Sequence, residues 1–152
     1  MNQTHVERLP EYYQQKNKCL LWDEINQVST QRLLVIDDEA HIRDTYNRLF
    51  RHYGFEVLTA SNATQANEML VQNKIDIVLL DIKMAEVDGS VLFGLIRTFH
   101  RNIKVVVSSV YPVDEQKERI EGADAYFDKS DGKDVLLGII ASLSGDENGL
   151  VI

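Results

Sequence analysis

The sequence predicts an α/β protein: a three-layer, doubly wound (βα)5 sandwich in which helices cover both faces of a parallel five-stranded sheet. Two observations carry this prediction. From Arg32 onward, five apolar segments, four of them short and rich in β-branched or aromatic residues, alternate with five segments of helical periodicity. Segments such as IDIVLL and IKVVVSS also lack clean polar alternation, which is typical of strands buried on both faces of a parallel sheet.

The five predicted strands are short apolar runs separated by polar or glycine-containing segments. In chain order they are RLLVI from Arg32, FEVLTA from Phe55, IDIVLL from Ile75, IKVVVSS from Ile103 and DAYF from Asp124. Because each run is followed by a helical pattern and short loops, consecutive strands are expected to be parallel and joined by helical crossovers.

The predicted helices fill the intervals between these strands. They cover residues 40–54, 62–73, 88–99, 112–122 and 134–143. The first ends at Gly54, which suits the C′ position, and the short polar fourth helix lies between Pro112 and Gly122. In the third, Asp88 is expected to cap the helix, and the inward-facing residues are expected to be Leu92, Leu95, Ile96 and Phe99.

Composition restricts the class of protein further. The 152 residues are 44% hydrophobic and 26% charged, which is ordinary for a globular domain and excludes wholesale disorder. A net charge of −8 argues against non-specific nucleic-acid binding. The single cysteine, Cys19, excludes an internal disulfide and a cysteine-based zinc site. No membrane-spanning run and no secretory signal is visible, so we expect a soluble, cytoplasmic protein.

Polar residues follow four of the predicted strands, where ligands bind in open parallel sheets. Asp37 and Asp38 follow the first strand, Asp81 the third, Ser109 the fourth and Lys129 the fifth. Three carboxylates without histidine or cysteine suit a hard divalent ion, and we expect Mg²⁺. With an ammonium and a hydroxyl beside them, they suit phosphoryl transfer to a carboxylate, and no glycine-rich nucleotide loop is present.

Four segments together resemble the receiver domain of two-component response regulators: LLVIDDEAHIR, IVLLDIKMAEVDG, VVVSSV and GADAYFDKS. The resemblance covers about residues 32–144 and implies a flavodoxin-like strand order 2-1-3-4-5. It also assigns roles to seven residues. By this resemblance, Asp81 is the phosphoacceptor and Lys129 is the lysine that contacts the phosphoryl group. The Mg²⁺ ligands it implies are Asp38 directly, Asp37 through water, Asp81, and the main-chain carbonyl of Lys83. Ser109 is implied as the switch hydroxyl and Tyr126 as the switch aromatic residue.

The chain departs from the family pattern at two positions. Ala85 and Ser130 stand where the family usually has proline, and the second change puts in doubt a cis peptide after Lys129. Neither change removes a ligand. The resemblance also places Lys83 and Tyr111 beside the path of the attacking water, where bulky side chains predict slow hydrolysis of the acyl phosphate.

The expected function is that of a phosphoacceptor receiver that is phosphorylated on Asp81 in a Mg²⁺-dependent reaction and signals to a protein through a conformational switch. Its only catalysis would be its own phosphorylation and dephosphorylation. The implied partners are a sensor histidine kinase or phosphotransfer protein, and a downstream protein on the face of the fourth helix, fifth strand and fifth helix. Residues 112–134 carry eight acids and four bases, which favours a basic protein partner over DNA. No membrane contact is expected, and a homodimer is left open.

Several alternatives stay open at this stage. The main one is a phosphohydrolase with an aspartate nucleophile, although such enzymes usually separate the two aspartates that are adjacent here as Asp37 and Asp38. A receiver-like adaptor that works without phosphorylation is another. Asp38 could be only a helix N-cap, and Ser108 could take the role of Ser109.

Outside the receiver the sequence says less. Residues 1–31 are expected to form a partly helical N-terminal extension, in which Leu21, Ile25 and Val28 share one helical face. Residues 145–152 are expected to be a C-terminal tail. The extension could pack on the receiver, mediate dimerisation, or belong to an upstream domain.

Overall fold

The computed structural model describes residues 31–146. The predicted extension, apart from Gln31, lies outside these residues, as do the last six residues of the chain. Within the described part no helix is long and apolar enough to cross a membrane.

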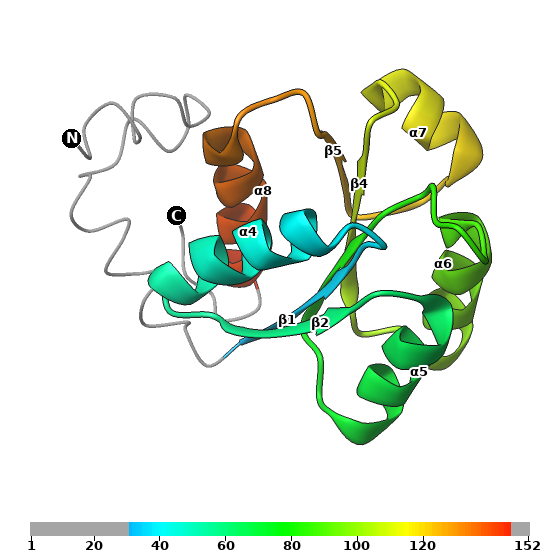
Figure 1. Ribbon diagram of the computed structural model, residues 1–152, viewed down its shortest axis with the longest axis horizontal. Coiled ribbons are helices and arrows are strands. Elements are labelled where there is room, and N and C mark those ends of the chain that lie inside the picture. The colour runs from blue at the N-terminus through cyan, green and yellow to red at the C-terminus, as the bar shows by residue number, and fades with distance from the viewer. Residues whose placement is uncertain (1–30, 147–152) are drawn as a thin grey trace.

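The sheet has five parallel strands in the order β2-β1-β3-β4-β5, which confirms the predicted fold class and strand order (Figure 1). The strands are β1 (Arg32–Ile36), β2 (Glu56–Ala60), β3 (Ile77–Leu80), β4 (Lys104–Ser109) and β5 (Ala125–Asp128). All five carboxyl ends therefore lie along one edge of the sheet, as parallel pairing requires.

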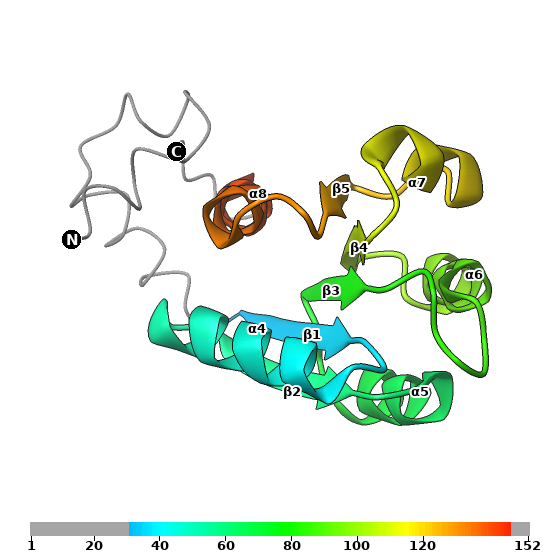
Figure 2. The ribbon, with the colours of Figure 1, turned by 45° about the horizontal axis from the view of Figure 1, so that its top comes forward.

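Five helices connect and cover the strands: α4 (Ala40–His52), α5 (Ala63–Gln72), α6 (Gly89–Phe99), α7 (Val113–Arg119) and α8 (Lys133–Asp146). Helices α4 and α8 lie on one face of the sheet, and α5, α6 and α7 lie on the other (Figure 2). This is the three-layer arrangement that alternating strands and helices predict.

Side chains along each strand point alternately to the two faces of the sheet and so fill the hydrophobic core on each face. On β1, Leu33 and Val35 pack under α4 and α8, whereas Leu34 and Ile36 pack under α5 and α6. All four are at most 1% exposed. Burying an aliphatic side chain of this size contributes about 1.5–3 kcal/mol to stability, so these central strands anchor the polar residues that follow them.

The helix boundaries confirm the predicted capping residues. Gly54 follows α4 with φ 92°, and Gly122 follows α7 with φ 87°, conformations that favour glycine. The carboxylate of Asp88 accepts a hydrogen bond from the backbone N–H of Ser90 at 2.8 Å and so caps α6. No peptide bond among residues 31–146 is cis, so the bond after Lys129 is trans.

One part of the predicted core is wrong. Leu92 and Ile96 of α6 are buried as expected, but Leu95 is 45% exposed and Phe99 is 72% exposed. Leu95 lies on the flank of the narrow stripe that faces the sheet, and Phe99 is the last residue of the helix. No described element packs over either side chain.

Candidate functional site

The acidic pair at the end of β1 divides into one buried and one exposed carboxylate. Asp37 is 2% exposed; its Oδ1 accepts the N–H of Glu39 at 2.9 Å, and its main-chain carbonyl accepts a guanidinium N–H of Arg43 at 2.7 Å. Asp38 is exposed, and its Oδ2 accepts the N–H of Ala85 at 3.2 Å, which ties β1 to the loop after β3.

The alternative that Asp38 only caps a helix is wrong. The N-cap of α4 is Glu39, whose side chain makes no capping hydrogen bond. Asp38 is therefore free of that role, and its carboxylate lies at the carboxyl edge of the sheet beside the loop that follows Asp81.

Asp81 follows β3 and is 5% exposed. Its N–H donates to the carbonyl of Ile36, and its Oδ1 accepts the N–H of Lys83 at 3.3 Å. Burial, opposed by the nearby Lys129 ammonium and reinforced by the charge of Asp37, raises the pKa of Asp81 to about 7. Asp81 is thus a carboxyl group whose ionisation falls within the neutral range.

Lys129 joins the two buried carboxylates. Its N–H donates to the carbonyl of Ser109, and its Nζ lies 2.6 Å from Asp37 Oδ2 and 3.5 Å from Asp81 Oδ1. Burial alone would lower the pKa of Lys129, but its hydrogen bond to Asp37 and the charges of Asp81 and Asp37 raise it overall. The ammonium therefore stays charged and lies closer to Asp37, which leaves Asp81 incompletely compensated.

The carboxylates at the start of this edge fit a hard cation. Asp37, Asp38 and Glu39 each place one carboxylate oxygen within 4.8 Å of the others. This oxygen-only donor set suits Mg²⁺. Glu39 was not among the predicted ligands, although it directly follows the two aspartates. Asp81 was a predicted ligand but lies outside this three-carboxylate group, and Lys129 Nζ lies between it and Asp37.

The two predicted switch residues lie on the same side of the sheet but are held by different partners. Ser109 is fully buried, and its Oγ accepts the N–H of Tyr111 at 3.3 Å. The hydroxyl of Tyr126 donates to the carbonyl of Ile120 at 2.7 Å and accepts the N–H of Ala123 at 3.2 Å. These bonds direct the Tyr126 hydroxyl toward the end of α7 rather than toward the acidic edge.

Ser108 and Ser109 differ in environment, which bears on the choice between them. Neighbouring residues of a strand point to opposite faces. Ser108 belongs to the face covered by α4, and its buried hydroxyl makes no hydrogen bond with the residues that the structure describes. Ser109 belongs to the α7 side, together with Val107.

Two residues that support the site were missed from the sequence. Gln116 of α7 is fully buried, and its Nε2 donates to the carbonyls of Tyr111 at 2.7 Å and Phe127 at 2.9 Å. A Cβ on Gly89 would lie 2.3 Å from the carbonyl oxygen of Asp81, so only glycine fits where α6 begins. Adjacent Asp88 and Gly89 are residues typical of a turn, but only the fold shows this close approach.

Comparison with known proteins identifies the family. The family model described as the response regulator receiver domain matches residues 33–141. The chain therefore belongs to the response regulator receiver family, whose members act in two-component signalling.

Individual relatives are similar over the same region. The chain is 30% identical to the sporulation initiation phosphotransferase F of Bacillus subtilis over 103 residues, 65% of this chain and 82% of that protein. It is 34% identical to the transcriptional regulatory protein PrrA of Mycobacterium tuberculosis over 104 residues, 67% of this chain. The match spans only 45% of PrrA.

Solved structures agree with this assignment. The response regulator TrrA of Thermotoga maritima, crystallised with Mg²⁺ and BeF, superposes with a TM-score of 0.70 at 30% identity, covering 75% of this chain and 99% of TrrA. TrrA in complex with the histidine kinase ThkA gives a TM-score of 0.66 at 30% identity, with 75% and 98% covered. A two-component response regulator of Clostridium difficile gives 0.73 at 21% identity, covering 78% and 99%, which supports the fold.

Proposed function

We propose that this chain is a phosphoacceptor receiver in which Asp81 accepts a phosphoryl group from the phosphohistidine of a sensor kinase or phosphotransfer protein. The observation that carries the proposal is the pair of buried carboxylates that share one ammonium, with Lys129 Nζ 2.6 Å from Asp37 and 3.5 Å from Asp81. One buried acid is enough to neutralise the Lys129 ammonium, and Asp37 does this. Burial of the second acid, Asp81, is costly and is explained by a chemical role.

In the proposed reaction a carboxylate oxygen of Asp81 forms a bond to phosphorus while the P–N bond of the donor breaks. The imidazole leaves with the electron pair and takes a proton from solvent. Lys129 is placed to pair with a phosphoryl oxygen, because its ammonium is already 3.5 Å from the nucleophilic carboxylate. Ser109 would turn its hydroxyl toward another phosphoryl oxygen by giving up the N–H of Tyr111.

We propose that Asp37, Asp38, Asp81 and the carbonyl of Lys83 hold Mg²⁺, and we add Glu39 as a further carboxylate close enough to contribute. When bound, the cation would neutralise this edge, keep Asp81 ionised and offset the charge of the phosphoryl oxygens. Without it, the raised pKa of Asp81 leaves much of that carboxyl protonated at neutral pH, which reduces its nucleophilicity.

The proposed switch runs from Ser109 to Tyr126. For Tyr126 to turn inward, its hydroxyl must leave the carbonyl of Ile120 and the N–H of Ala123. Those bonds tie β5 to the end of α7, so the change would alter the α7–β5–α8 face that we propose as the output surface.

The charge of that output surface is smaller than the sequence count suggests. Asp124 pairs with Arg97 at 2.9 Å, Glu115 pairs with Arg119 at 2.8 Å, and Asp134 is buried. The exposed acids outside these ion pairs are Asp114, Glu118, Glu121 and Asp131. We still propose a basic protein partner rather than DNA for this segment. The transcriptional regulator PrrA is more than twice as long as the part that this chain matches, so its name does not assign DNA binding to the matched part.

Two further elements of the proposal concern the chain's organisation and the lifetime of the phosphoryl group. We propose residues 32–144 as the receiver unit, with residues 1–31 as an extension and 145–152 as a tail. We also propose slow hydrolysis of the acyl phosphate. The ring of Tyr111 is held under the guanidinium of Arg119, 4.1 Å from its centroid, so a bulky group is fixed next to Ser109.

The test is phosphorylation of the full chain by a small phosphodonor with Mg²⁺, followed by intact mass spectrometry. The wild type should gain one phosphoryl group and Asp81→Asn should gain none. Asp88→Asn is the matched control, because it changes an exposed carboxylate in the same loop and asparagine also caps helices. A wild type that stays unmodified, or an Asp81→Asn protein that is modified equally, would contradict the proposal; steady turnover of a phosphate ester would favour the phosphohydrolase alternative.

A further inference from the structure

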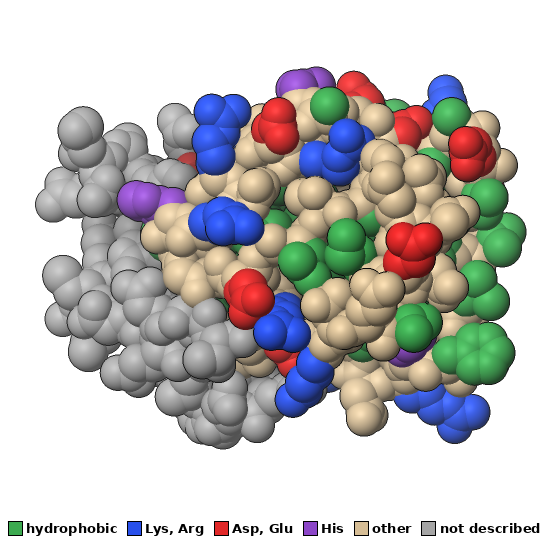
Figure 3. Space-filling model, turned by 60° about the horizontal axis from the view of Figure 1, so that its bottom comes forward, with side chains coloured by type: hydrophobic (Ala, Val, Ile, Leu, Met, Phe, Trp, Pro, Cys, Tyr) green, Lys and Arg blue, Asp and Glu red, His purple; other side chains and the backbone are tan. Residues whose placement is uncertain are grey.

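Helix α6 carries an apolar ridge that faces solvent. Val91, Leu95 and Phe99 are 57%, 45% and 72% exposed and are spaced at i, i+4 and i+8. Residues at this spacing form the i±4 ridge by which helices most often pack together. Figure 3 shows hydrophobic side chains gathered along the right-hand edge of the molecule. Three large apolar groups in one row on one helix exceed the scattered exposure that is normal for a surface.

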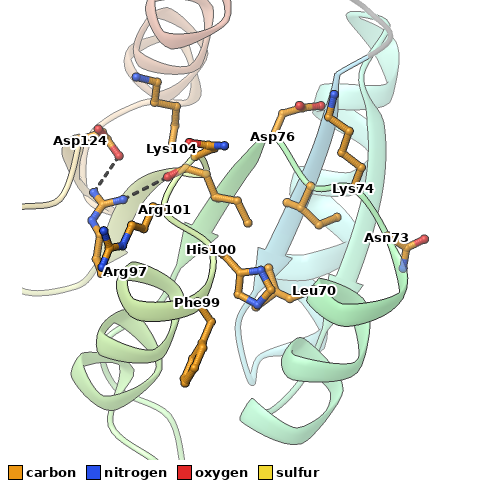
Figure 4. A pocket seen from close by; sticks show the side chains of 13 residues that line it. Leu70, Asn73, Lys74, Asp76, Arg97, Phe99, His100, Arg101, Lys104 and Asp124 are labelled. Atoms are coloured by element: carbon orange, nitrogen blue, oxygen red, sulfur yellow. Dashed lines mark hydrogen bonds and ion pairs between the residues drawn. The ribbon is translucent and has the colours of Figure 1, made fainter.

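The lower end of this ridge is basic. A hollow of about 670 Å³ lies between the ends of α5 and α6, and its rim carries Lys74, Arg101 and Lys104 (Figure 4). None of these three cations makes an ion pair or side-chain hydrogen bond within residues 31–146, whereas Arg97 is bound to Asp124 and to the carbonyl of Ile103. Phe99 both lines the hollow and ends the ridge, so the apolar ridge and the hollow are continuous.

The upper end of the ridge is acidic. Glu86 and Asp88 precede α6, and both are exposed. Between the two ends, Gly94 lies beside Leu95, and a Cβ added there would meet nothing within 4 Å. The absence of a side chain at Gly94, beside the centre of the ridge, lets a second helix approach closely.

We propose that α6 is a homodimer interface, in which the α6 helices of two copies pack antiparallel with Leu95 at the two-fold axis. In that arrangement Leu95 contacts Leu95 of the second copy, and Val91 contacts Phe99. The acidic end of each helix meets the basic end of the other. The interface is independent of the phosphoryl chemistry proposed above and lies on a different face from the α7–β5–α8 surface.

The charge pattern selects a second copy over other occupants. A ridge that is acidic at one end and basic at the other is self-complementary under a two-fold rotation, which an isologous interface requires. A small anion in the basic hollow would leave Val91 and Leu95 exposed. A uniformly charged peptide would be repelled at one end of the ridge.

Sedimentation of the full chain over a range of concentrations tests the interface. A single helix pair is small for an interface, so we expect a dissociation constant of about 10–100 μM. Leu95→Glu should weaken the dimer by about 100-fold or more, because it places two acids at the axis. Val110→Glu is the matched control, since it introduces the same charge at an exposed valine outside α6 and should leave the dimer intact. A chain that is monomeric up to about 1 mM, or a dimer that Leu95→Glu does not weaken, would overturn the proposal.

Two further sets of variants test the orientation. Glu86→Lys and Arg101→Glu should each weaken the dimer by about tenfold at low salt, and the double variant should recover most of the loss. In a Cys19→Ser background, Leu95→Cys should cross-link to its copy under mild oxidation. Val91→Cys should not, because antiparallel packing separates its two copies by about 12 Å. Ready cross-linking through position 91, or a double variant weaker than either single variant, would refute the antiparallel arrangement.

Discussion

Replacing Asp81 by asparagine should stabilise the protein, although Asp81 is the proposed nucleophile. Its carboxyl is buried, and its pKa is raised to about 7 from an ordinary value of 3.8, chiefly by burial. The native state therefore binds this proton more tightly than the unfolded state does. Consequently the free energy of unfolding falls as the pH rises from about 4 to about 7, and above that range the protein carries the full cost of a buried charge.

The size of the effect follows from the shift. About three pKa units at roughly 1.4 kcal/mol each give about 4 kcal/mol as the upper value above pH 7. The exposed Asp38 lies close enough to interact with the charge of Asp81, so solvent at this edge of the sheet reduces that upper value. We therefore expect Asp81→Asn to raise the free energy of unfolding by about 2 kcal/mol at pH 8, with a much smaller gain at pH 5.

Urea denaturation of the full chain in EDTA at pH 5 and pH 8 measures this difference without a bound cation. The control is Asp88→Asn, which removes an exposed carboxylate from the same loop and should show no such dependence on pH. Equal stability of the wild type and Asp81→Asn at pH 8, or a gain that is larger at pH 5 than at pH 8, would refute the reasoning. Asp37→Asn should do the opposite and destabilise, because it removes the carboxylate 2.6 Å from the Lys129 ammonium.

Four other measurements probe the site. Gly89→Ala should lower the free energy of unfolding by about 2 kcal/mol or more, because the added Cβ would clash with the backbone of Asp81. The control is Gly94→Ala, where space is open, and it should raise the free energy of unfolding by about 0.5–1 kcal/mol in dilute protein. Gln116→Leu should cost about 1–3 kcal/mol in urea denaturation, since two carbonyls lose their donor. Mg²⁺ should raise the melting temperature of the wild type but not of Asp38→Asn, and a similar rise in both would exclude this carboxylate as a ligand. Tyr111→Ala should shorten the half-life of the phosphorylated protein several-fold, and an unchanged decay rate would contradict the proposed shielding.

Much of the fold follows from local patterns. Runs such as RLLVI and IDIVLL are apolar on both faces, and this predicts central parallel strands because only a strand with helices on both sides can bury such a run. Parallel strands place their carboxyl ends at one edge, so the convergence of Asp37, Asp81 and Lys129 also follows from the sequence. Leu95 and Phe99 were mispredicted because periodicity identifies an apolar stripe without saying whether another element covers all of it.

The residues that sequence patterns missed depend on contacts between segments far apart in the chain. Gln116 lies in a polar helix and gives no local sign that its amide bridges the loop after β4 to β5. The need for glycine at position 89 arises from how closely α6 approaches the backbone of Asp81, which no turn signal describes. Both residues support the site and do not react. Their roles depend on how closely the helices and strands pack, and the sequence predicts those elements without predicting the distances between them.

The different roles of the two buried acids, Asp37 and Asp81, also depend on distances that the sequence does not predict. The sequence places three carboxylates and one ammonium at one sheet edge, and by charge alone the two that the structure buries, Asp37 and Asp81, are equivalent. The difference between 2.6 Å and 3.5 Å to Lys129 Nζ separates them, because the nearer acid takes most of the compensation and the farther one keeps the burial penalty. A carboxylate held in that condition gains most from any added positive charge, which is why a divalent cation and a nucleophilic role for Asp81 belong to the same proposal.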